Sequence, residues 1–280
     1  LESRRHTATA WVDIHIHRGR RLQPAYTVLY SPVEHSYQCL PVSATFVRVR
    51  MARSVAFDVQ HTHVDPANWD DIYVVGDPHG CRAAVERLCD RLGVTDTDLL
   101  IFVGDLVRKG PDSTGVVDLV RSAPNMVTVR GNNEEKLLRG TKTVPELTES
   151  DLDWIADRPL VITLPETLVV HAGVDPRKSR AEHTIDDLQN VRSMVPDASY
   201  QPPFWFDRYG GPERVFFGHT VLETPIIRDH AVGLDTGCVY GNELTAYDWR
   251  TDDIVTVEPT ETFVDRPAEK FISPPGSQSV

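Results

Sequence analysis

The chain has 280 residues, of which 40% are apolar, and this is enough material for a substantial hydrophobic core. Lys and Arg number 29 against 41 Asp and Glu, giving a net charge of −12. Such an acidic balance argues against a broad surface for nucleic-acid backbones, which needs basic residues. The longest apolar runs are about five residues, far below the roughly 20 that a membrane-spanning helix requires. We therefore expect a globular cytoplasmic protein with no membrane partner and no stable nucleic-acid binding.

The first 50 residues differ in composition from the rest of the chain. They hold seven Arg and three acidic residues, whereas residues 51–280 hold 22 basic and 38 acidic residues. No helical or strand period is clear before Met51, so we expect 1–50 to be a disordered N-terminal extension of doubtful status. His15 and His17 form an HxH pattern that also occurs in amidohydrolases. Such an enzyme needs a barrel of about 250 residues with further ligands downstream, and the sequence after this pattern fits another arrangement.

From residue 72 to about 257, β-rich runs alternate with helix-like segments, which predicts an α/β domain over 51–257. Helices are expected at 81–92, 114–121 and 148–156, the last opened by the N-cap pattern at Thr148. His61 and His63 precede the first strand and are expected in a solvated loop. Residues 258–280 are rich in Pro, Ser, Thr and acids, which predicts a flexible C-terminal tail.

One local pattern occurs five times: an apolar β run stops at a short polar motif. The five segments are IYVVGDPHG (72–80), LLIFVGDLV (99–107), VTVRGNNE (127–134), TLVVHAG (167–173) and RVFFGHT (214–220). In an open α/β sheet, ligands collect beyond the carboxyl ends of the strands, so these endings are expected to meet at one rim. The glycines at 76, 104, 131, 173 and 218 are expected to let the backbone turn sharply there.

The polar side chains at these endings are carboxylates, imidazoles and one amide, without a thiolate. This set suits divalent manganese, iron or zinc, and a cysteine-rich structural zinc site is disfavoured. Asp77 and His79 lie two residues apart and can reach one ion, while Asp105 is placed to bridge two. The candidate metal ligands are Asp77, His79, Asp105, Asn132, His171 and His219.

Six blocks in order resemble the calcineurin-like metallophosphoesterases, in the branch shared by phosphoprotein phosphatases and diadenosine-tetraphosphate hydrolases. The blocks are GDPHG (76–80), GDLVRKGPDS (104–113), RGNNE (130–134), HAGVD (171–175), GHT (218–220) and LDTGCVYGNELTAYD (234–248). The resemblance implies a four-layer α/β fold with two packed mixed β-sheets flanked by helices, and a dinuclear centre of two divalent metal ions. It places Asp77, His79 and Asp105 on the first ion, and Asp105, Asn132, His171 and His219 on the second. Two such ions lower the pKa of a shared water and polarise the phosphoryl oxygens.

The sequence departs from this family at the position of the proton donor. Family members usually carry a His after the motif asparagine, and phosphoprotein phosphatases pair it with an Asp. Here these positions hold Asn133 and Arg108. Asn133 can donate a hydrogen bond but cannot deliver a proton. We expect catalytic roles for Asp105, Asn133 and Arg108, and phosphate binding by Arg108, Lys109 and Arg192.

The main prediction is a metal-dependent phosphatase that hydrolyses phosphomonoesters, such as phosphoserine or phosphothreonine in proteins. Its partner is then a phosphorylated protein or a small nucleotide. An alternative is a dinucleoside polyphosphate hydrolase, because a nucleotide leaving group departs without an acid. A second alternative is a catalytically weak module that binds metal and phosphate.

Overall fold

The computed structural model describes residues 57–196 and 200–273, and the backbone of four strands before them. The chain divides into two compact units, Leu1–Val55 and Ala56–Val280. In the first unit, β1 (Trp11–Ile14), β2 (Tyr26–Ser31), β3 (Ser36–Leu40) and β4 (Val47–Val49) pair antiparallel in this order. His15 and His17 lie outside the described residues, and the prediction of a disordered extension over 1–50 stays a prediction.

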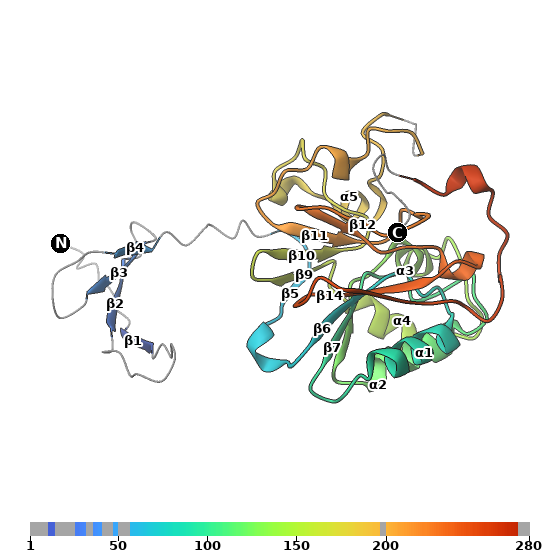
Figure 1. Cartoon of the computed structure of the whole chain (residues 1–280), viewed down its shortest axis with the longest axis horizontal. Coiled ribbons are helices and arrows are strands. Elements are labelled where there is room, and N and C mark those ends of the chain that lie inside the picture. Colours follow the sequence, from blue (N-terminus) through green and yellow to red (C-terminus); the bar gives the residue numbers. More distant parts are fainter. Residues whose placement is uncertain are drawn as a thin grey trace, which may run out of the picture. The chain divides into compact units, whose positions relative to one another are not determined.

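The second unit contains two mixed sheets (Figure 1). The five-stranded sheet has the order β15-β14-β6-β7-β8, and β6, β7 and β8 run parallel. The six-stranded sheet has the order β12-β13-β11-β10-β9-β5, with β10, β11 and β13 parallel. The strands of the first sheet are β6 (Ile72–Val75), β7 (Leu99–Phe102), β8 (Met126–Thr128), β14 (Leu244–Asp248) and β15 (Ile254–Val257). Those of the second are β5 (His61–His63), β9 (Val161–Leu164), β10 (Thr167–Val170), β11 (Arg214–Phe217), β12 (Ile226–Ile227) and β13 (Ala231–Gly233).

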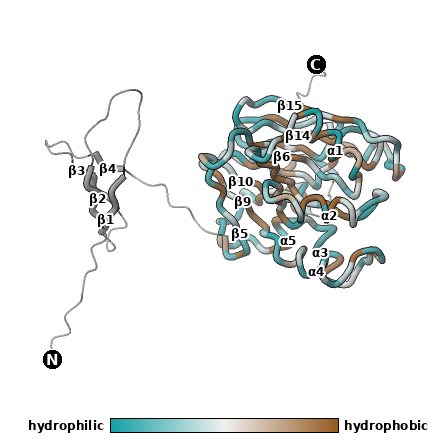
Figure 2. Tube along the Cα trace, turned by 90° about the horizontal axis from the view of Figure 1, so that it is seen from below, coloured by the Kyte–Doolittle hydropathy of each residue, from teal (hydrophilic) through white to brown (hydrophobic). Residues whose placement is uncertain are grey.

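Apolar side chains fill the space between the sheets and cover both outer faces. In Figure 2, the brown segments of the trace mark where these hydrophobic residues lie along the chain. Phe216 of one sheet and Tyr247 of the other pack edge to face in the middle core, with ring centroids 5.1 Å apart. Helices α1 (Arg82–Leu92) and α2 (Ser113–Ser122) cover the five-stranded sheet, and α5 (Ile185–Asn190) packs with the fully buried Trp205 on the other. These four layers confirm the predicted fold class.

The predicted helices are confirmed within about one residue at each end. Helix α1 ends at Gly93, which adopts a left-handed conformation, and the Asp112 side chain caps α2 by accepting from Gly115 N (2.7 Å). Helix α4 (Glu149–Ala156) begins after Thr148, whose side chain and that of Asp151 form a capping box. Helix α3 (Asn132–Leu138) has no counterpart among the predicted helices.

The prediction of a solvated loop at His61 and His63 is wrong, because these residues form the edge strand β5. The strand pairs in parallel with β9, and its three side chains are exposed. Without a buried face, it has no apolar alternation from which a strand could be predicted.

Residues 258–273 lie against the domain. Ile272 is buried; its backbone N–H donates to Val221 O (2.9 Å), and its carbonyl accepts from Glu223 N (3.2 Å). Phe263 and Val264 pack on the core between the helices and the five-stranded sheet. Residues 274–280 lie outside the described part of the chain, and the flexible tail stays a prediction for them.

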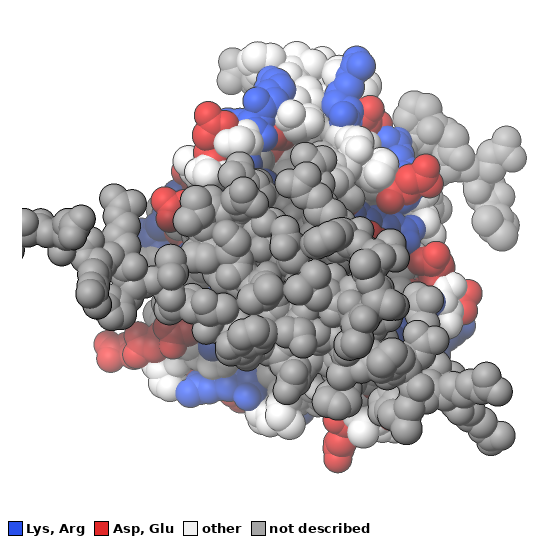
Figure 3. All heavy atoms as spheres, turned by 90° about the vertical axis from the view of Figure 1, so that its left-hand side faces the viewer, with Lys and Arg blue, Asp and Glu red and all other residues white. Residues whose placement is uncertain are grey.

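Where described residues are visible in Figure 3, acidic and basic side chains alternate without a large patch of one sign. Within the described part of the chain, every helix is too short or too polar to cross a bilayer. The cytoplasmic location stays a prediction.

Candidate metal centre

The five apolar segments form strands, as predicted, and the polar residues after them meet at one place. The strands belong to two different sheets. The loops after β6, β7 and β8 lead to Asp77, Asp105 and Asn132. After β10 and β11 of the facing sheet come His171 and His219. Hydrogen bonds at the site join the two sheets: His171 Nδ1 donates to Val103 O (2.8 Å), and His219 N donates to an oxygen of Asp77 (3.1 Å). The expected single rim is therefore the junction of two sheet edges.

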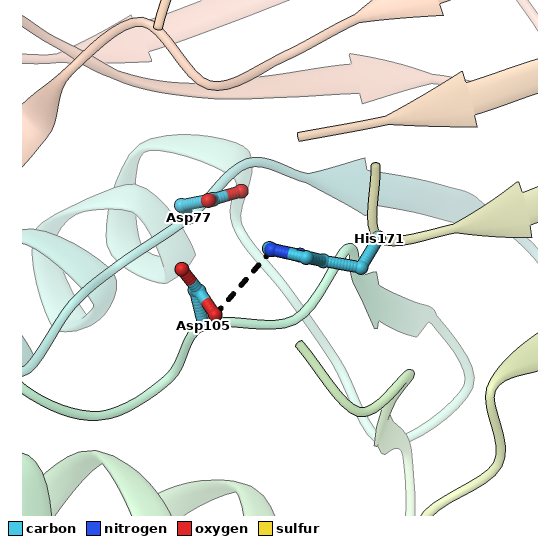
Figure 4. A group of neighbouring side chains, drawn as sticks. All are labelled: Asp77, Asp105 and His171. Atoms are coloured by element: carbon cyan, nitrogen blue, oxygen red, sulfur yellow. Dashed lines mark ion pairs between the residues drawn. The ribbon is translucent and has the colours of Figure 1, made fainter. Parts of the chain in front are cut away.

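Asp77, Asp105 and His171 form the centre of this junction (Figure 4). One ligand atom from each lies within 4.8 Å of the others, and all three side chains are buried. His171 Nε2 is 3.4 Å from Asp105 Oδ1, an interaction drawn as the dashed line. Among the described residues, Asp77 Oδ1 and His171 Nε2 have no hydrogen-bond partner. Buried polar atoms normally have a partner, and a bound metal ion would supply one to both of these atoms.

The remaining three predicted ligands surround this centre. His79 Nε2 is 3.5 Å from Asp105 Oδ2, and the rings of His171 and His219 lie 5.2 Å apart. Asn132 Nδ2 donates to His219 Nδ1 (3.2 Å). All six side chains are therefore gathered at one site, as the strand-end pattern predicted, and their role as ligands stays a proposal.

Backbone carbonyls orient two of the imidazoles. Nδ1 of His79 donates to Val107 O (3.2 Å), and Nδ1 of His171 donates to Val103 O. A carbonyl only accepts, so Nδ1 carries a proton in both rings, and Nε2 is the nitrogen that faces Asp105. This is the arrangement in which histidine binds a metal.

The electrostatics of the site fit divalent cations. Burial raises the pKa of Asp77, and the neighbouring carboxylates of Asp235 and Asp105 raise it further. Burial alone would also raise the pKa of Asp105, but the imidazoles of His171 and His79 together with Lys109 lower it. Burial lowers the pKa of His79 to about 3, so this imidazole is neutral and able to donate its lone pair. Several carboxylates buried together are costly unless a bound cation compensates their charge.

Site residues also hold an unusual backbone conformation. His79, Asp105 and His219 have φ of 46°, 51° and 61°, and Arg108 and Lys109 have φ of 70° and 74°. Positive φ is uncommon outside glycine and costs about 1–3 kcal/mol per residue. These five account for most of the seven non-glycine residues with positive φ in the described part of the chain. Strain concentrated in this way is typical of functional sites.

The three predicted phosphate-binding cations lie around the ligands. Lys109 Nζ is 2.7 Å from His79 Nε2, and Arg192 donates to His219 O (3.1 Å). Arg108 donates to the side-chain carbonyl of Asn133.

Asn133 connects Arg108 to the predicted metal ligands. Its backbone N–H donates to Asp105 Oδ1 (2.8 Å), and its amide nitrogen donates to Asp105 and to Asn132 Oδ1 (2.9 Å). Arg108 and Asn133 thus form one hydrogen-bonded pair at the two positions where the resemblance to phosphoprotein phosphatases implies an acid and an imidazole.

Sequence reasoning missed two buried carboxylates. Glu134 accepts from the backbone N–H groups of Asp105 (3.0 Å), Val107 (3.2 Å) and Gly131 (2.8 Å), and so fixes the loops that carry the ligands. Asp235 follows β13 and lies within electrostatic range of Asp77. The signal for both was present, because Glu134 closes the RGNNE block and Asp235 follows an apolar strand as the other site residues do.

The strand-end glycines serve two purposes. Gly104 and Gly173 have positive φ, as a sharp turn requires, whereas Gly218 does not. A Cβ at Gly218 would lie only 1.9 Å from Asp77 Oδ1. Gly76 and Gly131 also lack a positive φ. A sharp turn is therefore the wrong reason for Gly76, Gly131 and Gly218, and at Gly218 the absence of a Cβ lets the two sheet edges approach.

We expect Gly218→Ala to weaken Mn²⁺ binding by about 10- to 100-fold, because the added methyl displaces the Asp77 carboxylate. Calorimetric titration of Mn²⁺ measures this. Gly210→Ala is the matched control, since a Cβ there meets nothing within 4 Å. Equal Mn²⁺ affinity of the two variants would contradict the geometry.

Comparison with known proteins shows the family of the chain. Residues 71–257 match the family model described as calcineurin-like phosphoesterase. The chain is similar to bis(5′-nucleosyl)-tetraphosphatase PrpE (asymmetrical) of Halalkalibacterium halodurans, with 31% identity over 72% of this chain and 98% of that protein. The protein of the same name from Anoxybacillus flavithermus is 30% identical over 71% of this chain and 97% of its own length.

Among solved structures, the fold is similar to one named as a candidate diadenosine tetraphosphatase. The TM-score is 0.65 at 29% identity, and the alignment covers 71% of this chain and 97% of the other. The family match includes all six predicted ligands.

Proposed function

The chain belongs to the calcineurin-like phosphoesterase family, and we propose that within this family it hydrolyses dinucleoside polyphosphates of the diadenosine tetraphosphate type. The sequence alone favoured a phosphomonoester such as phosphoserine as the main prediction. The names of the relatives support the alternative better, and they do not specifically support a protein substrate.

The observation that carries the proposal is the contact between Arg108 and Asn133. Asn133 has no proton to give to a leaving oxygen, which disfavours alkyl monoesters because their leaving group needs protonation. A nucleotide leaving group has a low pKa and departs as an anion. The Arg108 guanidinium adds positive charge beside the predicted ligands, as a substrate with several phosphates requires.

The six predicted ligands would hold two divalent ions, and Mn²⁺, iron or Zn²⁺ suits their donor atoms. When bound, these ions polarise the phosphoryl group and lower the pKa of the attacking water. The side chains of Lys109 and Arg192 approach the ligands and would hold the phosphate oxygens. Glu134 holds the Asp105 loop in its strained conformation.

The surface beside Arg108 and Lys109 has room for an extended substrate. A hollow of about 360 Å³ adjoins Arg108 and Lys109 and continues to Thr143, Val144 and Pro145. This volume lies within the usual range of small-molecule pockets, about 300–1,000 Å³. A phosphate bound at the strand ends would therefore have space next to it for the distal part of a dinucleotide.

The test is a substrate panel with Mn²⁺-loaded protein: diadenosine tetraphosphate, a phosphoserine peptide and p-nitrophenyl phosphate. We expect kcat/KM for the dinucleotide to exceed that for the peptide by at least about 100-fold, the lower end of a general-acid contribution. Chromatography of the products distinguishes ATP plus AMP, which the asymmetrical relatives suggest, from two ADP. Preference for the peptide would overturn the proposal, and absence of metal-dependent turnover on all three would favour the binding module.

A further inference from the structure

Five aromatic and cationic side chains form a continuous row that we call the aromatic–cation arc: Lys109, Tyr240, Arg266, Tyr200 and Arg192. Lys109 Nζ lies 5.2 Å from the centroid of the Tyr240 ring. The Arg266 guanidinium is 4.8 Å from the Tyr240 ring and 5.8 Å from the Tyr200 ring. Arg192 completes the row at 4.7 Å from the Tyr200 ring.

Both ends of the arc touch predicted metal ligands. Lys109 contacts His79 at the end of the five-stranded sheet, and Arg192 donates to His219 O on the other sheet. The arc therefore spans from one group of ligands to the other, and a phosphate bound at the strand ends would lie beside it.

The central arginine is held in place before any ligand binds. Arg266 donates to Lys270 O (2.8 Å from Nη2), and its guanidinium also lies 5.6 Å from the Phe271 ring. Ile272, which follows Phe271, is buried against the domain and fixes the end of the segment 258–273 that carries Arg266. A preorganised side chain loses less conformational entropy on binding a ligand.

The Tyr200 ring has surface available for a ligand. Tyr200 is 40% exposed and is one of only three large hydrophobic residues classed as exposed in the described part of the chain. Tyrosine faces and arginine planes stack on nucleobases of every kind, and arginine also binds phosphate oxygens. An inorganic phosphate or a phosphoserine uses the cations of this arc but not its rings.

We propose that the aromatic–cation arc is a nucleoside subsite, in which the base of the substrate stacks on Tyr200 and Arg266 binds the adjoining phosphates. This inference rests on the proposed function and adds which side chains recognise the nucleoside. It assigns a substrate-binding role to residues 258–273, which the family match does not include.

The experiment compares diadenosine tetraphosphate with inorganic tripolyphosphate, which has no base, in Tyr200→Ala, Tyr200→Phe and Arg266→Ala. We expect Tyr200→Ala to lower the ratio of kcat/KM for the dinucleotide to that for tripolyphosphate by about tenfold, chiefly through KM, and Tyr200→Phe to retain the wild-type ratio. Arg266→Ala is expected to raise KM for the dinucleotide. Arg158→Ala is the matched control, because Arg158 stacks on Trp154 (4.5 Å) in helix α4, outside the arc.

Titration of AMP into the Mn²⁺-loaded proteins separates this inference from the proposed function. If the wild type binds AMP about tenfold more tightly than Tyr200→Ala but does not cleave the dinucleotide, the subsite stands and the proposed substrate is wrong. If the wild type cleaves the dinucleotide while the Tyr200 and Arg266 variants keep its KM and its AMP affinity, the arc is not a nucleoside subsite. A lowered melting temperature with unchanged KM would show that the arc only fastens the C-terminal segment.

Discussion

Asp105→Asn is expected to abolish metal binding and hydrolysis together. Asp105 lies within 3.5 Å of both His79 and His171, and it is the only predicted ligand assigned to both ions. Its replacement by the neutral amide keeps the volume but removes the charge that faces both imidazoles. Loss of an outer-sphere partner already costs 10- to 100-fold in metal affinity or activity, so loss of this carboxylate should exceed about 100-fold.

The measurement pairs elemental analysis for bound Mn²⁺ with the rate of diadenosine tetraphosphate cleavage, after thermal unfolding has shown that the variant folds. Asp98→Asn serves as the control, since Asp98 is also buried but accepts from Thr95 (2.8 Å) and Asp71 (3.2 Å) in another loop. Asp98→Asn is expected to retain metal and activity. Retention of full activity by Asp105→Asn would show that the centre lies elsewhere.

The double variant Arg108→Asp/Asn133→His is expected to gain phosphomonoesterase activity. It restores an imidazole beside the leaving group and an acid to orient it, and general-acid catalysis contributes about 10²- to 10⁴-fold. We expect about a 100-fold rise in kcat/KM for a phosphoserine peptide, whose leaving group needs a proton. For diadenosine tetraphosphate we expect a decrease, because the Arg108 cation is lost.

The single variants show whether the two positions act as a pair. In Asn133→His alone, the new imidazole faces the Arg108 guanidinium, which lowers the imidazole pKa and disfavours the protonated form. Its gain on the peptide is therefore expected to be small. Arg108→Asp alone should lose dinucleotide activity without gaining peptide activity. A double variant no better on the peptide than either single variant would contradict the role assigned to this pair.

Much of the site could be predicted because its information is local in the sequence. Each of the five segments is a short apolar run followed by a polar motif with a candidate ligand, so the strand and its candidate ligand can be recognised together. Asp77, Asp105 and His171 were found in this way, and the structure gathers them within 4.8 Å. The alternation of strands and helices predicted an α/β domain, and the four-layer arrangement was implied by the resemblance that the six blocks carry.

The rest depends on contacts between distant segments. No local pattern shows that Arg108 and Lys109 adopt positive φ, since neither residue type favours it. The contact of Arg266 with Tyr200 joins segments 66 residues apart and depends on how the chain after β15 docks. The substrate class could not be predicted from the candidate ligands, because the blocks that contain them resemble both phosphoprotein phosphatases and diadenosine-tetraphosphate hydrolases.

The junction of two sheet edges makes the site sensitive to residues that never contact a ligand. Each sheet carries some of the six candidate ligands. The apolar layer that includes Phe216 and Tyr247 lies between the two sheets and holds them apart. Protein interiors are close-packed, so the volume of these side chains fixes the spacing between the sheets. The core volume therefore sets the distance between the candidate ligands of one sheet and those of the other, and a larger residue deep in the interior would move His171 and His219 relative to Asp77 and Asp105.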